Sequence, residues 1–223
     1  MRRRHLLAVA LITSVLLAAT PASSLTGVYG GGGTSAPPPK PVPLPPHLQP
    51  TPVTSPPADV PADHWASSAI NQLRTAGLMI GDPDGNFRPD AQVSTAETVM
   101  VFLRLLGFSP KVGVDGQHWA DPALELARSV GWIGENQAKR PDDGMDRVGV
   151  ALVLARALKI EPVSGSPPWS DVSGLPPDAL GYLVALYQKG LFMGYPDGTF
   201  RPDRVVTRAE IAVLVSRILA GIR

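Results

Sequence analysis

The stretch "GYPDGTFRPDRVVTRAE", from Gly194 to Glu210, has a near copy elsewhere in the chain. The copy, "GDPDGNFRPDAQVSTAE", lies 113 residues earlier, from Gly81 to Glu97, and eleven of the seventeen positions are identical. Each version joins a Pro-Asp-Gly turn to a hydroxyl residue that is followed three positions later by glutamate. A turn and a helix start that recur together indicate an internal repeat.

The two turns have residues whose chemistry suits a tight reversal of the chain. Proline presets φ, aspartate bonds to nearby backbone, and glycine accepts a positive φ, so Gly85 and Gly198 are expected at the turns. The first turn also begins like a calcium-binding EF-hand loop. Its glycine stands at the fourth position instead of the sixth, however, and Val93 occupies the place of the bidentate glutamate. We therefore predict no metal site, and no pattern indicates a cofactor.

Both copies continue into a predicted helix start. Ser94 and Glu97 have the spacing of a capping box, and so do Thr207 and Glu210. In a capping box the hydroxyl and the glutamate satisfy backbone amides that the helix itself leaves without partners. Capping therefore explains the repeated acid without any binding function.

Capping does not explain Arg208, or Arg147 at the matching place of another repeat. A cation in the first turn opposes the helix dipole. A guanidinium held there beside free backbone amides would form a compact site for a carboxylate or a phosphate. The alternative is that Arg208 merely pairs with Glu210 or with a loop aspartate such as Asp197.

The repeat has three units. The pair Trp65-Ala66 recurs as Trp119-Ala120, and the segment that begins at Ser94 recurs at Asp146 and again at Thr207. Repeats of this length indicate stacked supersecondary units, none of which buries its apolar face alone. We place the units at residues 58–108, 109–161 and 162–223.

Each unit is predicted to contain two helices joined by a loop. The first helix is amphipathic and ends at a glycine, and Asp121 is expected to cap the one in the second unit. A short apolar link follows, which we expect to be buried and extended; in the third unit it runs from Leu191 to Met193. The second helices are apolar on most sides and should form the shared centre. Their predicted ranges are 96–106, 148–158 and 209–219.

The first 57 residues are predicted to lie outside this repeat domain. Residues 1–22 have the layout of a secretory signal peptide: a basic start, a run of fourteen apolar residues and a small-residue cleavage site. The run is short for a membrane-spanning helix, which needs about 20 residues. Residues 23–57 are rich in glycine and proline, with eleven prolines from Pro37 to Pro57. This composition predicts a disordered, semi-rigid polyproline tether.

Composition excludes several kinds of function. The chain has no cysteine, which excludes disulfides, thiolate metal sites and a lipoprotein anchor. Removal of the predicted signal peptide takes away Arg2, Arg3 and Arg4, which leaves 17 basic against 19 acidic residues, a net charge of −2. No basic run remains, so we predict no nucleic-acid partner, no polybasic membrane patch and no integral membrane anchor after cleavage.

The third copy, extended to "GYPDGTFRPDRVVTRAEIAVLVSRILAG" (residues 194–221), resembles the S-layer homology motif. The signature of that motif joins a Gly-x-x-Asp-Gly-x-Phe-x-Pro loop to Thr-Arg-Ala-Glu. The resemblance covers residues 59–221 as three tandem motifs. It implies a mainly α fold in which three helix-loop-helix repeats adopt a pseudo-threefold arrangement around a central helical bundle. It also implies a binding module and not an enzyme.

The resemblance further implies where and what the domain binds. In this family, grooves between motifs hold cell-wall glycan non-covalently, commonly a secondary cell-wall polymer with ketal-linked pyruvate or, in lineages with an outer membrane, modified peptidoglycan. The arginine of Thr-Arg-Ala-Glu is associated with the anionic group. Arg208 is thus the best candidate and Arg147 the second, with Glu210 and Asp197 beside them. A secreted protein at the cell wall or cell surface is expected.

Three departures from the family pattern predict unequal grooves, of which at most one or two bind. The first motif has Thr95 where arginine is expected. The second has Gly149 in place of the glutamate and "GENQAKRPDDG" (residues 134–144) in place of the turn, and the third lacks the tryptophan. Trp65 and Trp119 are candidates to stack on sugar rings, but as apolar residues at helical spacing they are expected in the core.

Two other functions compete with glycan anchoring. A structural or assembly protein of the envelope, with decayed grooves and protein partners, would fit the degenerate second motif. A wall hydrolase is the weaker alternative, because the domain contains only His64 and His118, in equivalent repeat positions. No Ser/His/Asp order or zinc spacing stands out. The sequence therefore predicts a non-enzyme.

Overall fold

The computed structural model describes residues 53 and 55–221, apart from residues 83, 112 and 115. The predicted signal peptide and the predicted tether up to residue 52 lie outside the described residues. The described part is mainly α, as the sequence predicts, and contains isolated β-bridges but no β-strand. Its helices are α2 (Ser67–Thr75), α3 (Thr95–Leu105), α4 (Asp121–Ser129), α5 (Glu135–Ala138), α6 (Arg147–Ala157), α7 (Pro177–Gln188) and α8 (Arg208–Leu219).

The second helices of the three units are α3, α6 and α8, and each begins one residue before its predicted start. They are the more buried helices: nine of the eleven residues of α3 are buried, against three of the nine in α4. Both predicted capping boxes are formed. Ser94 accepts a hydrogen bond from the Glu97 amide, Thr207 accepts one from the Glu210 amide, and both glutamates bond back to the cap residue's amide.

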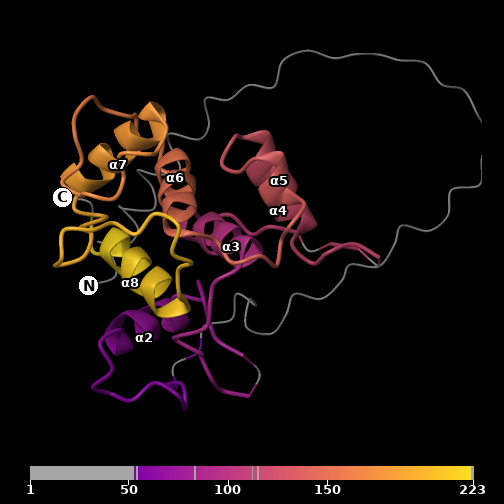
Figure 1. Cartoon of the computed structure of the whole chain (residues 1–223). Helices are drawn as coiled ribbons and strands as arrows, with labels where there is room; N and C mark the ends of the chain where they lie inside the picture. The colour runs from indigo at the N-terminus through magenta and orange to yellow at the C-terminus, as the bar shows by residue number, and fades with distance from the viewer. Residues whose placement is uncertain (1–52, 54, 83, 112, 115, 222–223) are drawn as a thin grey trace, which may run out of the picture.

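Helices of different units pack against one another. The first helix of the first unit, α2, packs on α8 of the third unit, while α4 packs on α3 and α7 packs on α6 (Figure 1). The first helix of each unit therefore packs against the second helix of another unit. This interlocking brings the N-terminal helix of the described chain beside its C-terminal helix.

Three backbone hydrogen bonds close a ring at the helix starts. The Val93 amide donates to the Val206 carbonyl, Met145 donates to Val93, and Val206 donates to Met145, each at 3.0 Å. Every helix-start segment is thus bonded to both of the others, one from each unit. Such a cycle agrees with the predicted pseudo-threefold arrangement, which itself stays a prediction.

The first backbone amides of each second helix donate hydrogen bonds to carbonyls in the loop of a neighbouring unit. In α8 the amides of Arg208 and Ala209 donate to the carbonyls of Ala91 and Pro89, both at 2.9 Å. The first two amides of α3 and of α6 are paired in the same way with residues 141–143 and 202–204. We call these contacts the α8, α3 and α6 junctions. Orphan amides at a helix start need such partners, so the units depend on one another.

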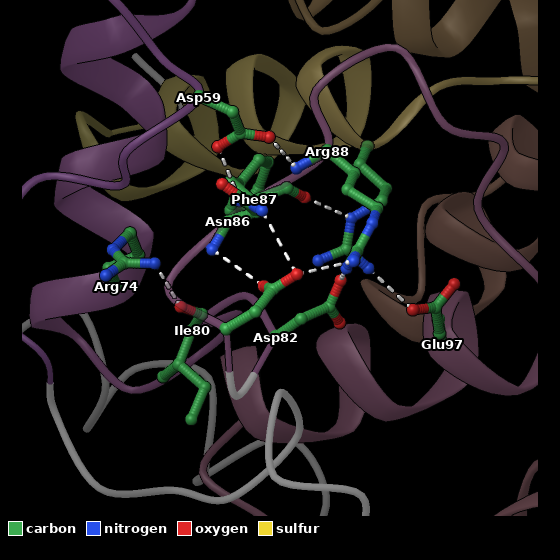
Figure 2. A network of polar contacts seen from close by, with 10 residues as sticks. Asp59, Arg74, Ile80, Asp82, Asn86, Phe87, Arg88 and Glu97 are labelled. Carbon is green, nitrogen blue, oxygen red and sulfur yellow. Dashed lines mark hydrogen bonds and ion pairs between the residues drawn. The ribbon is translucent and has the colours of Figure 1, made fainter.

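The repeated turn is held by a carboxylate that precedes it in sequence by almost thirty residues. Asp59 accepts hydrogen bonds from the amides of Phe87 and Arg88 at 2.7 and 2.6 Å (Figure 2). In the third unit, Asp171 accepts from Phe200 and from Arg201 at 2.8 and 2.7 Å. These two carboxylates could have been found from the sequence, because the pair Asp59-Val60 recurs 112 residues later as Asp171-Val172, but sequence reasoning did not use this recurrence.

The bonds to these carboxylates fix the turns. The second donor of each pair, Arg88 or Arg201, has a left-handed φ, of 53° and 59°, that side chains other than glycine rarely adopt. Gly85 and Gly198, at the tips of the turns, have φ of 87° and 78°, as turn chemistry requires.

Two local expectations need correction, and one short helix was not foreseen. Asp121 is not a cap but the first residue of α4; Ala120 is the cap and makes no side-chain bond, while Asp121 accepts from the His118 amide. The link after α7 is buried only in part, because Met193 is 53% exposed. The stretch that lacks the turn in the second unit forms the short helix α5, which its sequence did not indicate.

The start of the described chain is fastened to α2. The Val53 amide donates to the Arg74 carbonyl at 3.1 Å, and the Arg74 guanidinium donates to the Ser55 carbonyl at 3.0 Å and to the Ile80 carbonyl. Arg74 is buried as a result. Within the described ranges, no helix is both long enough and apolar enough to cross a membrane.

The carboxylate of Asp171 provides a test of how the turn is held. Asp171→Asn is expected to lower the free energy of unfolding by about 2 kcal/mol, because a neutral amide replaces a charged group that accepts from two backbone amides. Urea denaturation followed by circular dichroism measures the change. The control is Asp203→Asn, whose carboxylate makes no hydrogen bond within the described chain. Equal stability of the two variants would contradict the assigned role.

Candidate functional site

Arg208 lies buried in the α8 junction, with its charge already paired. Its Nε donates to the Phe87 carbonyl at 2.7 Å, and Nη1 donates to Glu97 Oε1, also at 2.7 Å. The guanidinium carbon lies 4.9 Å from the centre of the Phe87 ring. Burial lowers the pKa of the Arg208 guanidinium from its usual value, and the Glu97 carboxylate opposes that shift.

The geometry of the α8 junction overturns two expectations about Arg208. Its acidic partner is Glu97 of the first unit, and neither Glu210 nor Asp197 as the sequence suggested. No free amides surround it either, because its own amide and that of Ala209 are taken by loop carbonyls. Within this pairing, Nη2 is the one guanidinium nitrogen that is buried without a hydrogen-bond partner among the described residues.

Arg147 occupies the same position in the α6 junction, with looser pairing. Its guanidinium carbon lies 5.3, 4.9 and 5.0 Å from the ring centres of Phe192, Tyr195 and Phe200. The nearest carboxylate oxygen in an ion pair, Glu210 Oε1, is 4.0 Å from Nη1. Nε is buried and has no hydrogen-bond partner in the described part of the chain. Desolvation lowers the pKa of Arg147, and Tyr195 and Glu210 partly offset this effect.

A cavity of about 350 Å³ opens beside Arg147. Its wall comes from α6, α8, the link that follows α7, and the segment before α2. Apolar residues form much of this wall, and the polar groups converge from several elements. The lining includes the side chains of Trp65, Arg147, Met193, Tyr195, Glu210 and Arg217.

The Glu210 carboxylate is held by several donors. It therefore fixes the positions of the side chains around it and is not free to bind a cation. Its Oε2 accepts from the Thr207 amide at 3.0 Å, and Oε1 accepts from the Tyr195 hydroxyl at 3.2 Å. Arg204 forms an ion pair with the same Oε1. Arg147 and Arg204 pair with this one carboxylate, and Arg217 lies on the wall of the same cavity, so positive charge is in excess.

The α8 junction has the opposite charge balance. Asp82 stands where the third unit has Tyr195, and Ala91 stands where it has Arg204. Asp82 forms an ion pair with Arg88 in the network of Figure 2. An anion that approached Arg208 would therefore meet additional carboxylates, whereas one that approached Arg147 would meet additional guanidinium groups.

The α3 junction has no arginine in the first turn. Thr95 takes that position, and its hydroxyl donates to the Asp143 carbonyl at 3.3 Å. Beside it lies a second cavity, of about 210 Å³, whose lining includes Thr95, Asn136 and Gln137. The three junctions are thus chemically unequal, as the departures from the repeat pattern predicted.

The tryptophans are placed differently from one another. Trp65 is 63% exposed and lies on the wall of the larger cavity, so the expectation that it belongs to the core is wrong. Trp119 is half-buried and packs against the core. Sequence reasoning missed Trp169, which is buried with its ring centre 4.7 Å from that of Phe200. No repeat signal marked it, because Pro57 stands at the matching place of the first unit.

Asp197 lies in the turn and outside the wall of the cavity. It accepts from the Thr199 hydroxyl at 2.6 Å and pairs with Arg201 at 2.8 Å. These contacts, the bond from Thr199 first, lower the pKa of Asp197 from its usual 3.8 to about 2. Its role in binding stays a prediction. The described residues contain no group of three or more His, Asp or Glu side chains that could hold a metal ion.

Two segments of the chain match the S-layer homology domain. They are residues 58–99 and 168–212, which fall in the first and third units. Residues 100–167 are not matched, so the assignment of a third motif to the second unit stays a prediction.

The chain is also similar to named bacterial surface proteins. It is 30% identical over 183 residues to cell surface glycoprotein 1 of Acetivibrio thermocellus, which covers 73% of this chain and 8% of that protein. An S-layer protein of Bacillus thuringiensis subsp. finitimus is 27% identical over 168 residues, covering 71% and 21%.

A cellulosome-anchoring protein of Acetivibrio thermocellus is 29% identical over 161 residues, covering 65% of this chain and 36% of the relative. The chain thus spans well under half the length of each of these relatives. Other proteins that match have the names of enzymes, an amylopullulanase and an exoglucanase.

The two arginines should differ in their contribution to stability. Arg208→Ala is expected to lower the free energy of unfolding by about 3–5 kcal/mol, because it removes the buried member of an ion pair with Glu97 that measures 2.7 Å. Arg147→Ala should cost less, since Glu210 keeps Arg204 and Tyr195 as partners. Urea unfolding of both variants makes the comparison, and a larger loss for Arg147→Ala would contradict the assigned pairing.

The low pKa of Asp197 has a defined consequence for pH dependence. Because the folded pKa of about 2 lies below the usual 3.8, its ion pair stabilises the fold fully above about pH 4. That contribution is lost as the pH falls toward 2. A carbon-13 NMR titration of the carboxyl should show a midpoint near pH 2, and Thr199→Val should raise it. An unchanged midpoint in Thr199→Val would exclude Thr199 as the main cause.

Proposed function

We propose that the protein attaches non-covalently to the cell envelope by binding an anionic cell-wall glycan in the cavity beside Arg147. The match to the S-layer homology domain, together with relatives named for cell-surface, S-layer and anchoring proteins, supports a secreted location at the cell wall or surface. The partner in this proposal is a secondary cell-wall polymer or peptidoglycan-linked glycan.

The observation that carries the proposal is the state of Arg147. Its guanidinium faces a cavity of about 350 Å³, its nearest ion-pairing carboxylate is 4.0 Å away, and its buried Nε has no partner among the described residues. A ligand carboxylate in the cavity, such as ketal-linked pyruvate, would pair with the Arg147 guanidinium through a charge-assisted hydrogen bond. The excess positive charge of Arg204 and Arg217 favours the same class of ligand.

The apolar part of the cavity suits the sugar ring that carries the anion. Trp65 exposes its indole at the wall of the cavity, and Met193 lies exposed on the same wall. An indole face packs well against the apolar face of a sugar, and its N–H remains available to a hydroxyl. Arg147 would then fix the charged substituent while Trp65 supplies contact area.

Arg208 becomes the second candidate in this proposal, in reverse of the ranking from sequence. Its Nε and Nη1 are paired with the Phe87 carbonyl and with Glu97, and Asp82 adds negative charge nearby. A ligand at Arg208 would have to break its ion pair with Glu97, in which both side chains are largely removed from solvent, and this costs several kcal/mol. One anionic glycan site per chain follows, at the α6 junction.

A second candidate function is structural: an envelope assembly protein that acts through protein partners. The internal pairing of Arg208 with Glu97 and the Phe87 carbonyl favours it, because that junction stabilises the fold without a ligand. In that case Arg147 would also be a structural residue, and its cavity would have no glycan specificity. No enzymatic activity is proposed; the absence of one stays a prediction, since similar segments occur in proteins named as enzymes.

Co-sedimentation with purified sacculi tests the proposal. The protein should bind native sacculi and not sacculi stripped of their secondary polymer. Arg147→Gln should weaken binding at least about tenfold, since a charge-assisted hydrogen bond contributes about 1.5–3 kcal/mol. Arg128→Gln is the matched control, because it removes the same charge from an exposed side chain of α4.

The outcomes separate the two candidate functions. Loss of binding in Arg147→Gln alone places the glycan at the α6 junction. Equal binding by Arg147→Gln and Arg128→Gln would refute the glycan site at Arg147. Failure of the unaltered protein to sediment with every wall preparation would favour the assembly function.

A further inference from the structure

Met193 brings the one exposed sulfur atom of the described chain to the cavity beside Arg147. The residue is 53% exposed, whereas the other methionines of the described part, Met79, Met100 and Met145, are buried. The sequence contains no cysteine, so no thiol competes with this thioether for an oxidant. Methionine sulfur is commonly oxidised to the sulfoxide, and access of the oxidant decides which methionine reacts. Oxidation of sulfur in the folded chain is therefore directed to Met193.

The repeat itself does not require a methionine at this place. The matching residues are Ile80 in the first unit and Gly134 in the second, and neither contains sulfur. Ile80 is half-buried, unlike Met193. The exposed thioether thus belongs to the unit whose link borders the cavity beside Arg147.

The backbone at Met193 is fixed on both sides. Its carbonyl accepts a hydrogen bond from Trp169 Nε1 at 3.4 Å, and the Leu191 amide donates to the Leu186 carbonyl at 3.0 Å. The next residue, Gly194, has a left-handed φ of 72°, and a Cβ atom there would collide with the Trp169 ring. The link therefore has little freedom to withdraw the Met193 side chain, so a chemical change at the sulfur alters the wall of the cavity.

A guanidinium with unused donors lies on the same wall. Arg217, in the last turn of α8, lines the cavity and makes no hydrogen bond or ion pair with another described residue. The matching arginines of the other units, Arg104 and Arg156, donate to the carbonyls of Leu78 and Trp132 at 3.4 and 3.1 Å. Arg217 is thus available to a new acceptor in the cavity, whether that acceptor belongs to a ligand or to the protein.

We propose that Met193 is a site of reversible oxidation by peroxides, and that the sulfoxide lowers the affinity of the cavity for its anionic ligand. The second part of this inference rests on the proposed function. A lone pair of the sulfur attacks one oxygen of hydrogen peroxide, the O–O bond breaks, and proton transfer releases water. The sulfur is oxidised by two electrons and the peroxide is reduced. A dithiol-dependent sulfoxide reductase reverses the change, forming a disulfide in the reductase and releasing water.

Two effects of the sulfoxide weaken binding of the ligand. Oxidation converts a flexible apolar side chain into a polar one beside the exposed indole of Trp65, so the wall loses apolar contact with a sugar ring. The sulfoxide oxygen is also a hydrogen-bond acceptor on the wall that carries Arg147 and Arg217. It therefore competes with the carboxylate of the ligand for guanidinium donors.

Peptide mass spectrometry of the peroxide-treated protein tests the selectivity of oxidation. The folded protein is treated with hydrogen peroxide, which catalase then removes. One oxygen atom should be found on Met193 well before Met79, Met100 or Met145 is oxidised. Fragment ions separate this product from one with the oxygen on Trp65.

Co-sedimentation of the same samples with native sacculi tests the effect on binding. Treated protein should bind about fivefold more weakly than untreated protein, as expected for the loss of one hydrogen bond or a similar contact. A methionine sulfoxide reductase should restore the binding. The control is Met193→Leu, which has no sulfur at this position. Whatever its own affinity, this variant should bind equally before and after treatment.

Each outcome decides the proposal. Oxidation of the buried methionines as fast as Met193 would overturn the selectivity. Equal binding before and after oxidation of Met193, or the same weakening in treated Met193→Leu, would overturn the effect on binding. Failure of the untreated protein to bind any sacculi would reject the anionic site and this effect with it, whereas unchanged binding after oxidation rejects the effect alone.

Discussion

The ring of three backbone hydrogen bonds through Val93, Met145 and Val206 is the constraint on which the rest of the molecule depends. Around it, the first two backbone amides of each of the helices α3, α6 and α8 donate to carbonyls of another unit. A helix start without such acceptors leaves polar groups unpaired, at a cost comparable to lost hydrogen bonds. No unit therefore satisfies the first backbone amides of its own second helix. The apolar packing of each first helix against the second helix of another unit makes the units depend on one another as well.

The ring also fixes which side chains meet at the junctions, and the chain uses the three equivalent places differently. Arg208 is ion-paired with Glu97 and contributes to stability. Arg147 keeps an unpaired nitrogen beside a cavity. Thr95 leaves a neutral space. A guanidinium that is ion-paired inside the protein stabilises it and has less left for a ligand, so Arg208 and Arg147 differ in what they can offer.

Local signals in the sequence predicted the second helices to within one residue, because caps and apolar periodicity act over a few positions. The same reasoning gave Arg208 partners close in sequence, although its true partner, Glu97, is 111 residues away and reaches it only through closure of the ring. Trp65 was expected in the core from its spacing, yet it precedes α2 and stays exposed. The short α5 had no periodicity to reveal it.

The fastening of the chain at Arg74 has a mechanical consequence. Tension applied to the backbone at Val53 first meets the hydrogen bonds that join Val53 and Ser55 to Arg74, and through them the helix α2. Because α2 packs on α8 and Arg74 also donates to the Ile80 carbonyl, that load reaches both the last helix of the described chain and the first unit. Pulling would thus strain the packing between the first and third units as well as the first unit itself, so resistance to force does not belong to one unit alone.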